Sequence, residues 1–210
     1  MAYKIKEIYY TLQGEGAHAG RPAIFCRFSG CNLWTGREED RAKAICKFCD
    51  TDFWGMDGKL GGKYTARDLV FQCRSLWPEN SNVPPYVVCT GGEPALQIDQ
   101  KLIEEFHKFG FKVAIETNGT LHLPEGLDWI CISPKANSDI VIEKANEIKI
   151  VFPQIGINPI EYEDMDVQHW YIQPMDNVDL IENTKKCVSF CKDNPKWSLS
   201  VQSHKYINIP

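Results

Sequence analysis

Residues 31–52 read CNLWTGREEDRAKAICKFCDTD and carry three cysteines, Cys31, Cys46 and Cys49, in the pattern Cys-x14-Cys-x2-Cys. Thiolates are soft ligands that select zinc, copper or iron–sulfur clusters, so the number of cysteines separates the alternatives. A structural zinc site normally takes four Cys or His ligands, whereas three cysteines on a cluster of four irons leave one iron for an exogenous ligand. The triad therefore predicts an incomplete metal site whose free iron is the working atom.

Length and composition indicate one globular domain. The chain has 210 residues, 43% hydrophobic and 24% charged, which is enough to bury a sizeable core. No apolar run reaches the roughly 18 residues of a membrane span, and residues 1–7 lack the apolar region of a signal peptide. Nine cysteines, an odd number in a chain too long to need disulfides, favour a reducing compartment. We expect a single domain over residues 1–210, in the cytoplasm and without membrane association.

The charge balance favours a small-molecule substrate. The formal net charge is -5, whereas affinity for nucleic acid depends largely on Lys and Arg that neutralise phosphates. No nucleic-acid partner is therefore expected. Four cysteines outside the triad occupy apolar positions of expected helices and strands and are interpreted as buried core residues. These are Cys73, Cys89, Cys131 and Cys187.

Short apolar strands alternate with amphipathic helices along the chain, which favours an α/β fold with a largely parallel sheet. Strands are expected at 4–10, 23–28, 86–89, 112–116, 129–132, 147–152, 170–173 and 197–201. Helices are expected at 66–77, with Thr65 as N-cap, at 100–109 and at 179–192, and a flexible loop at 55–62. Few helices for many strands predict an abbreviated or open TIM-like barrel, with ligands at the carboxyl ends of the strands.

A second motif, Thr90-Gly91-Gly92-Glu93-Pro94, follows the expected strand 86–89. Its two glycines let the backbone approach a ligand closely, and Glu93 offers a carboxylate acceptor. By itself the segment is typical of an ordinary turn. Downstream of a three-cysteine motif, it favours a ligand site.

With these two motifs the chain resembles the radical S-adenosylmethionine superfamily, most of which spaces the triad as Cys-x3-Cys-x2-Cys. The first gap here is longer, and residues 36–41 within this 32–45 insert can form a short charged helix. The long gap, the opening TLQGEG (11–16) and the motif Cys49-Asp50-Thr51 are similar to the 7-carboxy-7-deazaguanine synthase family of queuosine biosynthesis. The match runs essentially end to end, through FSGCNLW (28–34), ETNGT (116–120), SPK (133–135), QPM (173–175) and HKYINIP (204–210).

The resemblance implies an enzyme, a lyase that contracts 6-carboxy-5,6,7,8-tetrahydropterin to 7-carboxy-7-deazaguanine with loss of ammonia. It implies a [4Fe-4S] cluster on Cys31, Cys46 and Cys49, S-adenosylmethionine on the free iron, and Mg2+ on Thr51. For a lone threonine, a cap or turn role is the alternative. No catalytic side chain is expected, because the cofactor carries the chemistry. A flavodoxin-like external one-electron donor and a homodimer are implied as well.

The resemblance also implies two groups of binding residues. Those expected at S-adenosylmethionine are Phe48, Cys49, Asp50, Gly91, Gly92, Glu93, Ser133, Pro134, Lys135, Gln173, Pro174, Met175 and Asp176. Those expected at the pterin are Leu12, Gln13, Gly14, Glu15, Arg27, Thr90, Glu116, His204 and Pro210. The side chains of Gln13, Glu15 and Glu116 suit the donors and acceptors of a 2-amino-4-oxo pyrimidine edge. For the two glutamates, an ordinary structural role is the alternative.

Arg27 can be assigned from the strand pattern. Alternation puts Arg27 with Ala23 and Phe25 on one face of the strand 23–28, and the other face is apolar throughout. A guanidinium in such a buried strand needs an anion, and a bidentate carboxylate is its best geometric match. The substrate carboxylate is the expected partner, and an internal Arg–Glu pair is the alternative.

Two other functions stay open at this point. A zinc-binding module would use Cys26, Cys31, Cys46 and Cys49, although Cys26 falls in the middle of a strand rather than in a tight turn. An activase that generates a glycyl radical on a partner protein would keep the cluster and lose the pterin site. Such an activase has no use for Arg27, Thr51 or the 204–210 tail.

Overall fold

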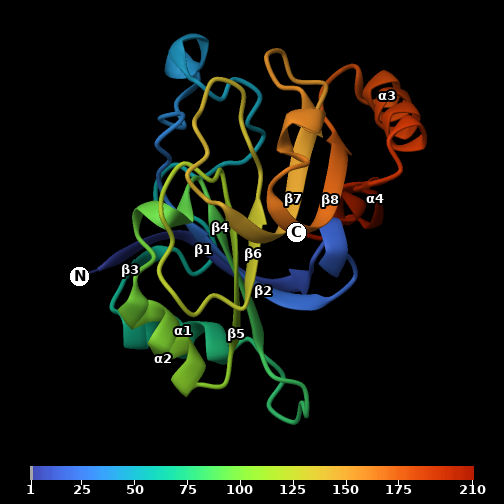
Figure 1. The fold of residues 1–210 in the computed structure, drawn as a ribbon. Coiled ribbons are helices and arrows are strands. Elements are labelled where there is room, and N and C mark those ends of the chain that lie inside the picture. Colours follow the sequence, from blue (N-terminus) through green and yellow to red (C-terminus); the bar gives the residue numbers. More distant parts are fainter. Residues whose placement is uncertain (1) are drawn as a thin grey trace.

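The computed structural model describes residues 2–210, which form one nine-stranded sheet with helices on its outer side (Figure 1). The strands are β1 (Tyr3–Leu12), β2 (Pro22–Phe28), β3 (Gly62–Tyr64), β4 (Tyr86–Gly91), β5 (Lys112–Thr117), β6 (Trp129–Ile132), β7 (Lys144–Phe152), β8 (Asp166–Pro174) and β9 (Trp197–Leu199). Their order is β3-β1-β2-β4-β5-β6-β7-β8-β9. β1 is antiparallel to β2 and β3, and every pairing from β2 to β9 is parallel. The sheet is not closed, which confirms the expected α/β open barrel.

Four α-helices and four short 3-10 helices connect the strands of the described chain. The α-helices are α1 (Ala66–Arg74), α2 (Gln100–Lys108), α3 (Leu180–Asp193) and α4 (Ser203–Ile207). The 3-10 helices are η1 (Gly16–His18), η2 (Glu38–Lys43), η3 (Pro94–Leu96) and η4 (Pro159–Tyr162). In Figure 1, α1 and α2 lie together at one end of the sheet and α3 at the other. The parallel connections β5–β6, β6–β7 and β7–β8 contain no α-helix, which is why the barrel has fewer α-helices than strands.

The two faces of the sheet differ in chemistry because alternate side chains point to opposite sides of each strand. On β7, Ile148 and Ile150 pack into a hydrophobic cluster with α3, whereas Lys149 and Val151 line a cavity on the other face. A larger cluster holds β1, β2, β4 and β5 against the apolar stripes of α1 and α2. Each large aliphatic side chain buried there stabilises the fold by roughly 1.5–3 kcal/mol. Helices α1, α2 and α3 therefore cover the outer face and leave the inner face for polar groups.

Several element boundaries differ from the sequence prediction. Thr65 Oγ1 accepts a hydrogen bond from the Asp68 amide at 3.3 Å, which confirms the predicted cap of α1. The helix nevertheless ends at Arg74 rather than 77, because the amides of Leu76 and Trp77 bond three residues back and tighten the chain into a turn. The predicted strand 197–201 ends at Leu199. β3, at the end of the expected 55–62 loop, and α4 were not predicted, since three and five residues carry too little periodicity.

The charged insert forms the short helix expected of it, as the 3-10 helix η2.

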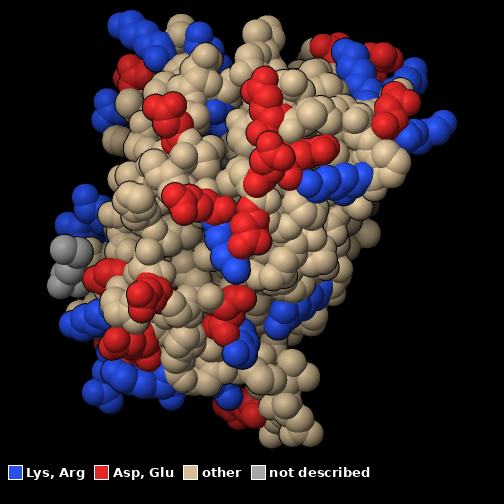
Figure 2. Space-filling model, in the orientation of Figure 1, with Lys and Arg blue, Asp and Glu red and all other residues tan. Residues whose placement is uncertain are grey.

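Within residues 2–210, no helix is long and apolar enough to cross a membrane. Acidic and basic side chains are interspersed on the face of the molecule shown in Figure 2.

Candidate active site

A cavity of about 680 Å³ lies on the inner face of the sheet, at the carboxyl ends of the parallel strands. Its walls come from seven strands, from the loops that follow them and from the C-terminal segment. The predicted metal-ligand and binding residues line this cavity with two exceptions, Glu93 and Pro134. The structure therefore brings together side chains from residue 12 to residue 210 in one site.

The three cysteines of the triad meet in this cavity, although 14 residues separate the first from the second. The amides of Ile45 and Cys46 both donate to Leu33 O, at 3.1 and 3.3 Å, and so fold the insert back onto Cys31. Arg41 Nη1 of η2 donates to the carbonyl oxygens of Lys47 and Cys49, at 3.0 and 3.1 Å. The 32–45 insert therefore determines the conformation of the loop that carries Cys46 and Cys49, and is more than a connection between Cys31 and Cys46.

Burial raises the pKa of the Cys31 and Cys46 thiols. A metal cluster binds thiolates, so its binding must displace these protons. Lys135, which is half-buried and also lines the cavity, interacts electrostatically with Cys46 and Cys49, and its ammonium group donates to Ser133 O at 2.6 Å. A positive charge at this place favours the thiolate form.

Cys26 is not part of the triad site. It is fully buried on the outer face of β2, in the hydrophobic cluster that also holds Cys73 and Cys89. No three His, Cys, Asp or Glu side chains within residues 2–210 are arranged to hold a single metal ion. The position of Cys26 contradicts the four-cysteine zinc site, because that thiol faces the core and the triad faces the cavity.

The core interpretation of the remaining cysteines is right for Cys73, Cys89 and Cys187, which are fully buried among apolar side chains. Cys131 is also buried, but it borders the cavity, and its thiol donates to Glu147 Oε1 at 3.4 Å. For Cys131 the core interpretation is therefore incomplete.

The Gly91-Gly92-Glu93 segment packs backbone to backbone against the loop that leads to Cys31. A Cβ atom on Gly92 would lie 2.1 Å from Gly30 O, and the amide of Glu93 donates to the same oxygen at 2.8 Å. Gly91 and Gly92 line the cavity as predicted. The glycine at position 92 is thus required by a close approach of two chain segments.

Glu93 does not face the cavity. Its carboxylate is fully buried and accepts hydrogen bonds from Thr117 Oγ1 at 2.7 Å, from the Asn118 amide at 2.7 Å and from the Ala95 amide at 2.9 Å. Its carboxylate thereby joins the end of β4 to the end of β5. That Glu93 is one of the residues that bind S-adenosylmethionine stays a prediction.

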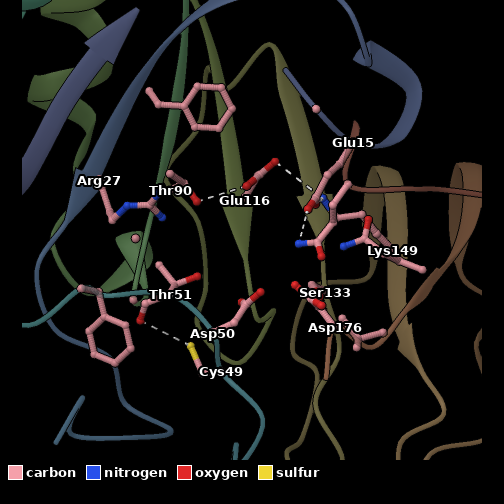
Figure 3. A pocket seen from close by; sticks show the side chains of 18 of the residues that line it. Glu15, Arg27, Cys49, Asp50, Thr51, Thr90, Glu116, Ser133, Lys149 and Asp176 are labelled. Atoms are coloured by element: carbon pink, nitrogen blue, oxygen red, sulfur yellow. Dashed lines mark hydrogen bonds and ion pairs between the residues drawn. The ribbon is translucent and has the colours of Figure 1, made fainter. Parts of the chain in front are cut away.

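The inner end of the cavity is lined with carboxylates and amides (Figure 3). Glu116 accepts from Gln13 Nε2 at 2.9 Å and from Thr90 Oγ1 at 3.1 Å. Lys149 forms an ion pair with Glu15 and lies 3.7 Å from Glu116 Oε1. Lys149 was not among the residues predicted from the sequence, although a charged residue inside the expected strand 147–152 is the same kind of signal that identified Arg27.

Arg27 lines the cavity but already has an internal anion. Its Nε donates to Glu7 Oε1 at 2.8 Å and its Nη2 donates to Tyr9 OH at 2.9 Å. Glu7 lies opposite Arg27 in the antiparallel register of β1 and β2. The alternative of an internal Arg–Glu pair is therefore present in the structure, and the two bonds leave Nη1 for a further partner.

The C-terminal segment closes one side of the cavity. The Ser203 amide donates to Gly14 O at 3.0 Å, and the ring of His204 lies so close that a Cβ on Gly14 would be 2.1 Å from His204 Nδ1. Thr11 Oγ1 donates to Pro210 O at 2.9 Å.

Lys205, which was not predicted from the sequence either, joins two loops that border the cavity. It bonds to Asp50 at 2.8 Å and forms a second ion pair with Asp176. It therefore links the loop after Cys49 to the loop after β8.

Known proteins resemble this chain over its whole length. The 7-carboxy-7-deazaguanine synthase of Burkholderia multivorans is 55% identical over 211 residues, and that of Caulobacter vibrioides is 52% identical over 211 residues, each with 100% of both chains covered. The chain belongs to the 7-carboxy-7-deazaguanine synthase family. This confirms the resemblance drawn from the triad and its neighbouring motifs.

The fold supports membership of the same family. The crystal structure of QueE from Escherichia coli matches with a TM-score of 0.74 and 28% identity, over 97% of this chain and 95% of that chain. A scan against models of protein families gives no match. As a member of the 7-carboxy-7-deazaguanine synthase family, the chain is an enzyme with an open α/β barrel.

Proposed function

We propose that the chain contracts 6-carboxy-5,6,7,8-tetrahydropterin to 7-carboxy-7-deazaguanine, with loss of ammonia, as a radical S-adenosylmethionine lyase. The observation that supports this most strongly is one cavity with two chemically different ends. Cys49 lies at one end, and the carboxylates of Glu15 and Glu116 lie at the other (Figure 3). Cys31 and Cys46 also line the cavity, and both lie close enough to Cys49 to interact with it electrostatically. Such an arrangement suits a metal cluster that works on a small nitrogen-rich ring.

The donor set at the first end fits the proposed cofactors. Three thiols are the soft ligands of a [4Fe-4S] cluster that keeps one iron for S-adenosylmethionine. When bound, these cofactors would supply the one-electron chemistry that removes a hydrogen atom from the substrate. The residues proposed to hold S-adenosylmethionine include Ser133, Lys135 and Asp176, which line the cavity beside the triad.

The other end fits the substrate by its hydrogen-bonding groups. Glu15, Glu116 and Gln13 offer acceptors and one amide donor to the pyrimidine edge. Arg27, with Nη1 not used by Glu7 or Tyr9, is the proposed partner of the pterin carboxylate. The activase alternative is not favoured, because these groups lie inside a cavity where a small molecule fits and a protein surface does not.

The direct test is turnover by the anaerobically purified enzyme with its cluster reconstituted. We expect 7-carboxy-7-deazaguanine and ammonia when 6-carboxytetrahydropterin, S-adenosylmethionine, Mg2+ and a reductant are supplied, with the product identified by mass spectrometry. Enzyme with a full iron and sulfide content that forms no deazaguanine under these conditions would contradict the proposed function.

Thr51 is the proposed Mg2+ ligand, because it lines the cavity two residues after Cys49 and a hydroxyl suits a metal whose other ligands are substrate oxygens and water. Thr51→Ala is expected to raise the Mg2+ concentration for half-maximal activity about tenfold, equivalent to ~1.4 kcal/mol, and to leave the cluster intact. A Mg2+ titration of turnover measures this. Thr184→Ala in α3, outside the cavity, is the control. An unchanged Mg2+ dependence of Thr51→Ala counts against the assignment.

The contact between Thr11 and Pro210 predicts that additions after Pro210 disturb the substrate end of the cavity. A histidine tag appended after Pro210 is expected to raise KM for the pterin about tenfold or more, the loss of ~1.4 kcal/mol of binding, with unchanged iron content. The same tag placed before residue 1 is the control. Equal KM values for the two tagged enzymes would show that Pro210 has no part in the site.

Other expectations stay predictions. They are the flavodoxin-like external electron donor, the homodimer and the cytoplasmic location. That residues 1–210 form one domain is supported by a single sheet that runs beneath both hydrophobic clusters.

A further inference from the structure

Lys149 occupies a position that the proposed function does not yet explain. It lies in the middle of β7 with its side chain on the inner face, and only 5% of the residue is exposed. Its ammonium group pairs with Glu15 and lies 3.7 Å from Glu116 Oε1 (Figure 3). A buried lysine costs free energy unless its charge is matched, so these contacts are what allow it to lie there.

The two carboxylates beside Lys149 retain capacity for a ligand. Glu116 accepts one hydrogen bond on each oxygen, from Gln13 and from Thr90. Glu15 accepts from Gln202 on Oε1 and from Lys149 on Oε2. Each carboxylate oxygen has two acceptor positions, so both side chains can take further N–H donors from the cavity.

We propose that Lys149 is a positioning residue that holds the Glu15 and Glu116 carboxylates as paired acceptors for the pyrimidine edge of the substrate. This rests on the proposed function, because it takes a 2-amino-4-oxo ring as the ligand. Two fixed acceptors favour a ring that presents N–H donors at that edge and disfavour one that presents carbonyl oxygens. Lys149 would thereby determine specificity through its neighbours.

Electrostatics support the same assignment. Burial opposes the charged form of Glu15, but the charge and hydrogen bond of Lys149, with Gln202 and His204, outweigh it and hold the pKa of Glu15 below its usual range. Burial likewise opposes the charged form of Lys149, but Glu116 and Glu15 outweigh it and raise the pKa of the ammonium group. Both groups therefore remain charged together.

Other titratable groups also act on Glu15 and Lys149, and Tyr9 of β1, Arg27 of β2 and Tyr86 of β4 act on the adjoining Glu116. Glu147 comes from β7, Cys131 from β6, Lys135 from the loop after β6, and His204 from α4. Glu147 accepts from the Ala17 amide at 3.0 Å and from Cys131, so its carboxylate has partners of its own. Lys149 is the residue that forms ion pairs with both Glu15 and Glu116.

The expected pH dependence follows from the sign of the shift. A lowered carboxylate pKa keeps Glu15 an acceptor as the pH falls. Without Lys149, burial raises the pKa of Glu15, the carboxylate takes up a proton, and it then presents a donor to the ring. The affinity of a variant without Lys149 for the pterin ring should therefore fall at lower pH and recover at higher pH.

The test compares Lys149→Met with the wild-type holoenzyme, and uses Lys144→Met, the same change at the exposed start of β7, as control. Fluorescence titration with 6-carboxypterin measures affinity across pH, and 6-carboxylumazine, with an oxo group in place of the 2-amino group, measures specificity. Lys149→Met is expected to bind 6-carboxypterin about tenfold more weakly at neutral pH, the effect of a one-unit pKa change. Its preference for pterin over lumazine should shrink, and Lys149→Arg should restore the wild-type pH profile.

A double variant keeps the test decisive if Lys149→Met alone is unstable. Glu15→Gln combined with Lys149→Met removes the ion pair but leaves Glu116, so a positioning role predicts a combined loss of affinity smaller than the sum of the two single losses. Additive losses, or a Lys149→Met enzyme with the affinity, pH profile and specificity of Lys144→Met, would overturn the inference. Wild-type turnover of the tetrahydropterin is measured in parallel, so failure of the proposed function is seen separately.

Discussion

Cys49→Ala is expected to abolish the iron–sulfur cluster and the activity together. Cys49 lines the cavity with Cys31 and Cys46, and the insert holds its loop through Arg41. Two thiols cannot retain the cluster that three were proposed to hold, and without it no electron reaches S-adenosylmethionine. Iron and sulfide content should fall to a small fraction of the wild-type value, and product formation should fall to background.

A matched control separates loss of a ligand from loss of a thiol. Cys191→Ala in α3 removes a half-buried cysteine that borders neither the triad nor the cavity, and should retain both cluster and activity. Anaerobic iron analysis, electron paramagnetic resonance of the reduced protein and turnover are measured on both variants. A full cluster signal in Cys49→Ala would refute its assignment as a ligand.

Gly92→Ala is expected to have the next largest effect, on stability and on the cluster. The added Cβ would lie 2.1 Å from Gly30 O and 2.9 Å from the ring of Phe53, and the contact with Gly30 is backbone that cannot rotate away. The overpacking, together with distortion of the hydrogen bond from the Glu93 amide to Gly30 O, should lower the free energy of unfolding by roughly 2–4 kcal/mol. Because Gly30 precedes Cys31, the displaced loop should also reduce cluster occupancy.

Gly110→Ala provides the comparison, because a Cβ at Gly110 meets nothing within 4 Å. Its positive φ of +79° still carries a cost of about 1 kcal/mol for a residue other than glycine. Thermal unfolding should show a fall of roughly 10 °C for Gly92→Ala and a clearly smaller one for Gly110→Ala. Equal shifts, with normal iron content in both, would show that the contact with Gly30 does not matter.

Local sequence patterns predicted much of this fold because they act over a few residues. Period-two and helical patterns located eight of the nine strands and three of the four α-helices of the described chain, and Thr65 was identified as a cap. The same patterns failed for β3 and α4, which are too short to repeat a period and depend on the segments they contact. Those contacts are long-range, such as Ser203 with Gly14.

The candidate site shows the same division between chemistry and geometry. Arg27 was recognised as a buried charge, but its contact with Glu7 follows from the register of β1 and β2, which no local pattern specifies. The motif predicted that Glu93 lies near the site, but only the structure shows that its carboxylate accepts hydrogen bonds from Thr117 and Asn118 at the end of β5. Lys149 was missed because its partners lie on other strands.

The sequence by itself determined the kind of chemistry, since three cysteines, and not four, on a long-gap motif leave one iron free for a cofactor. Only the tertiary structure decided which groups act together. In the folded chain, the side chain of Cys26 points into the core, and Arg41 of the insert holds the loop that carries Cys49. Lys149 lies between Glu15 and Glu116. The physical reason is that residue type is local, whereas charge pairing and close packing depend on strand register and on how far the barrel curves.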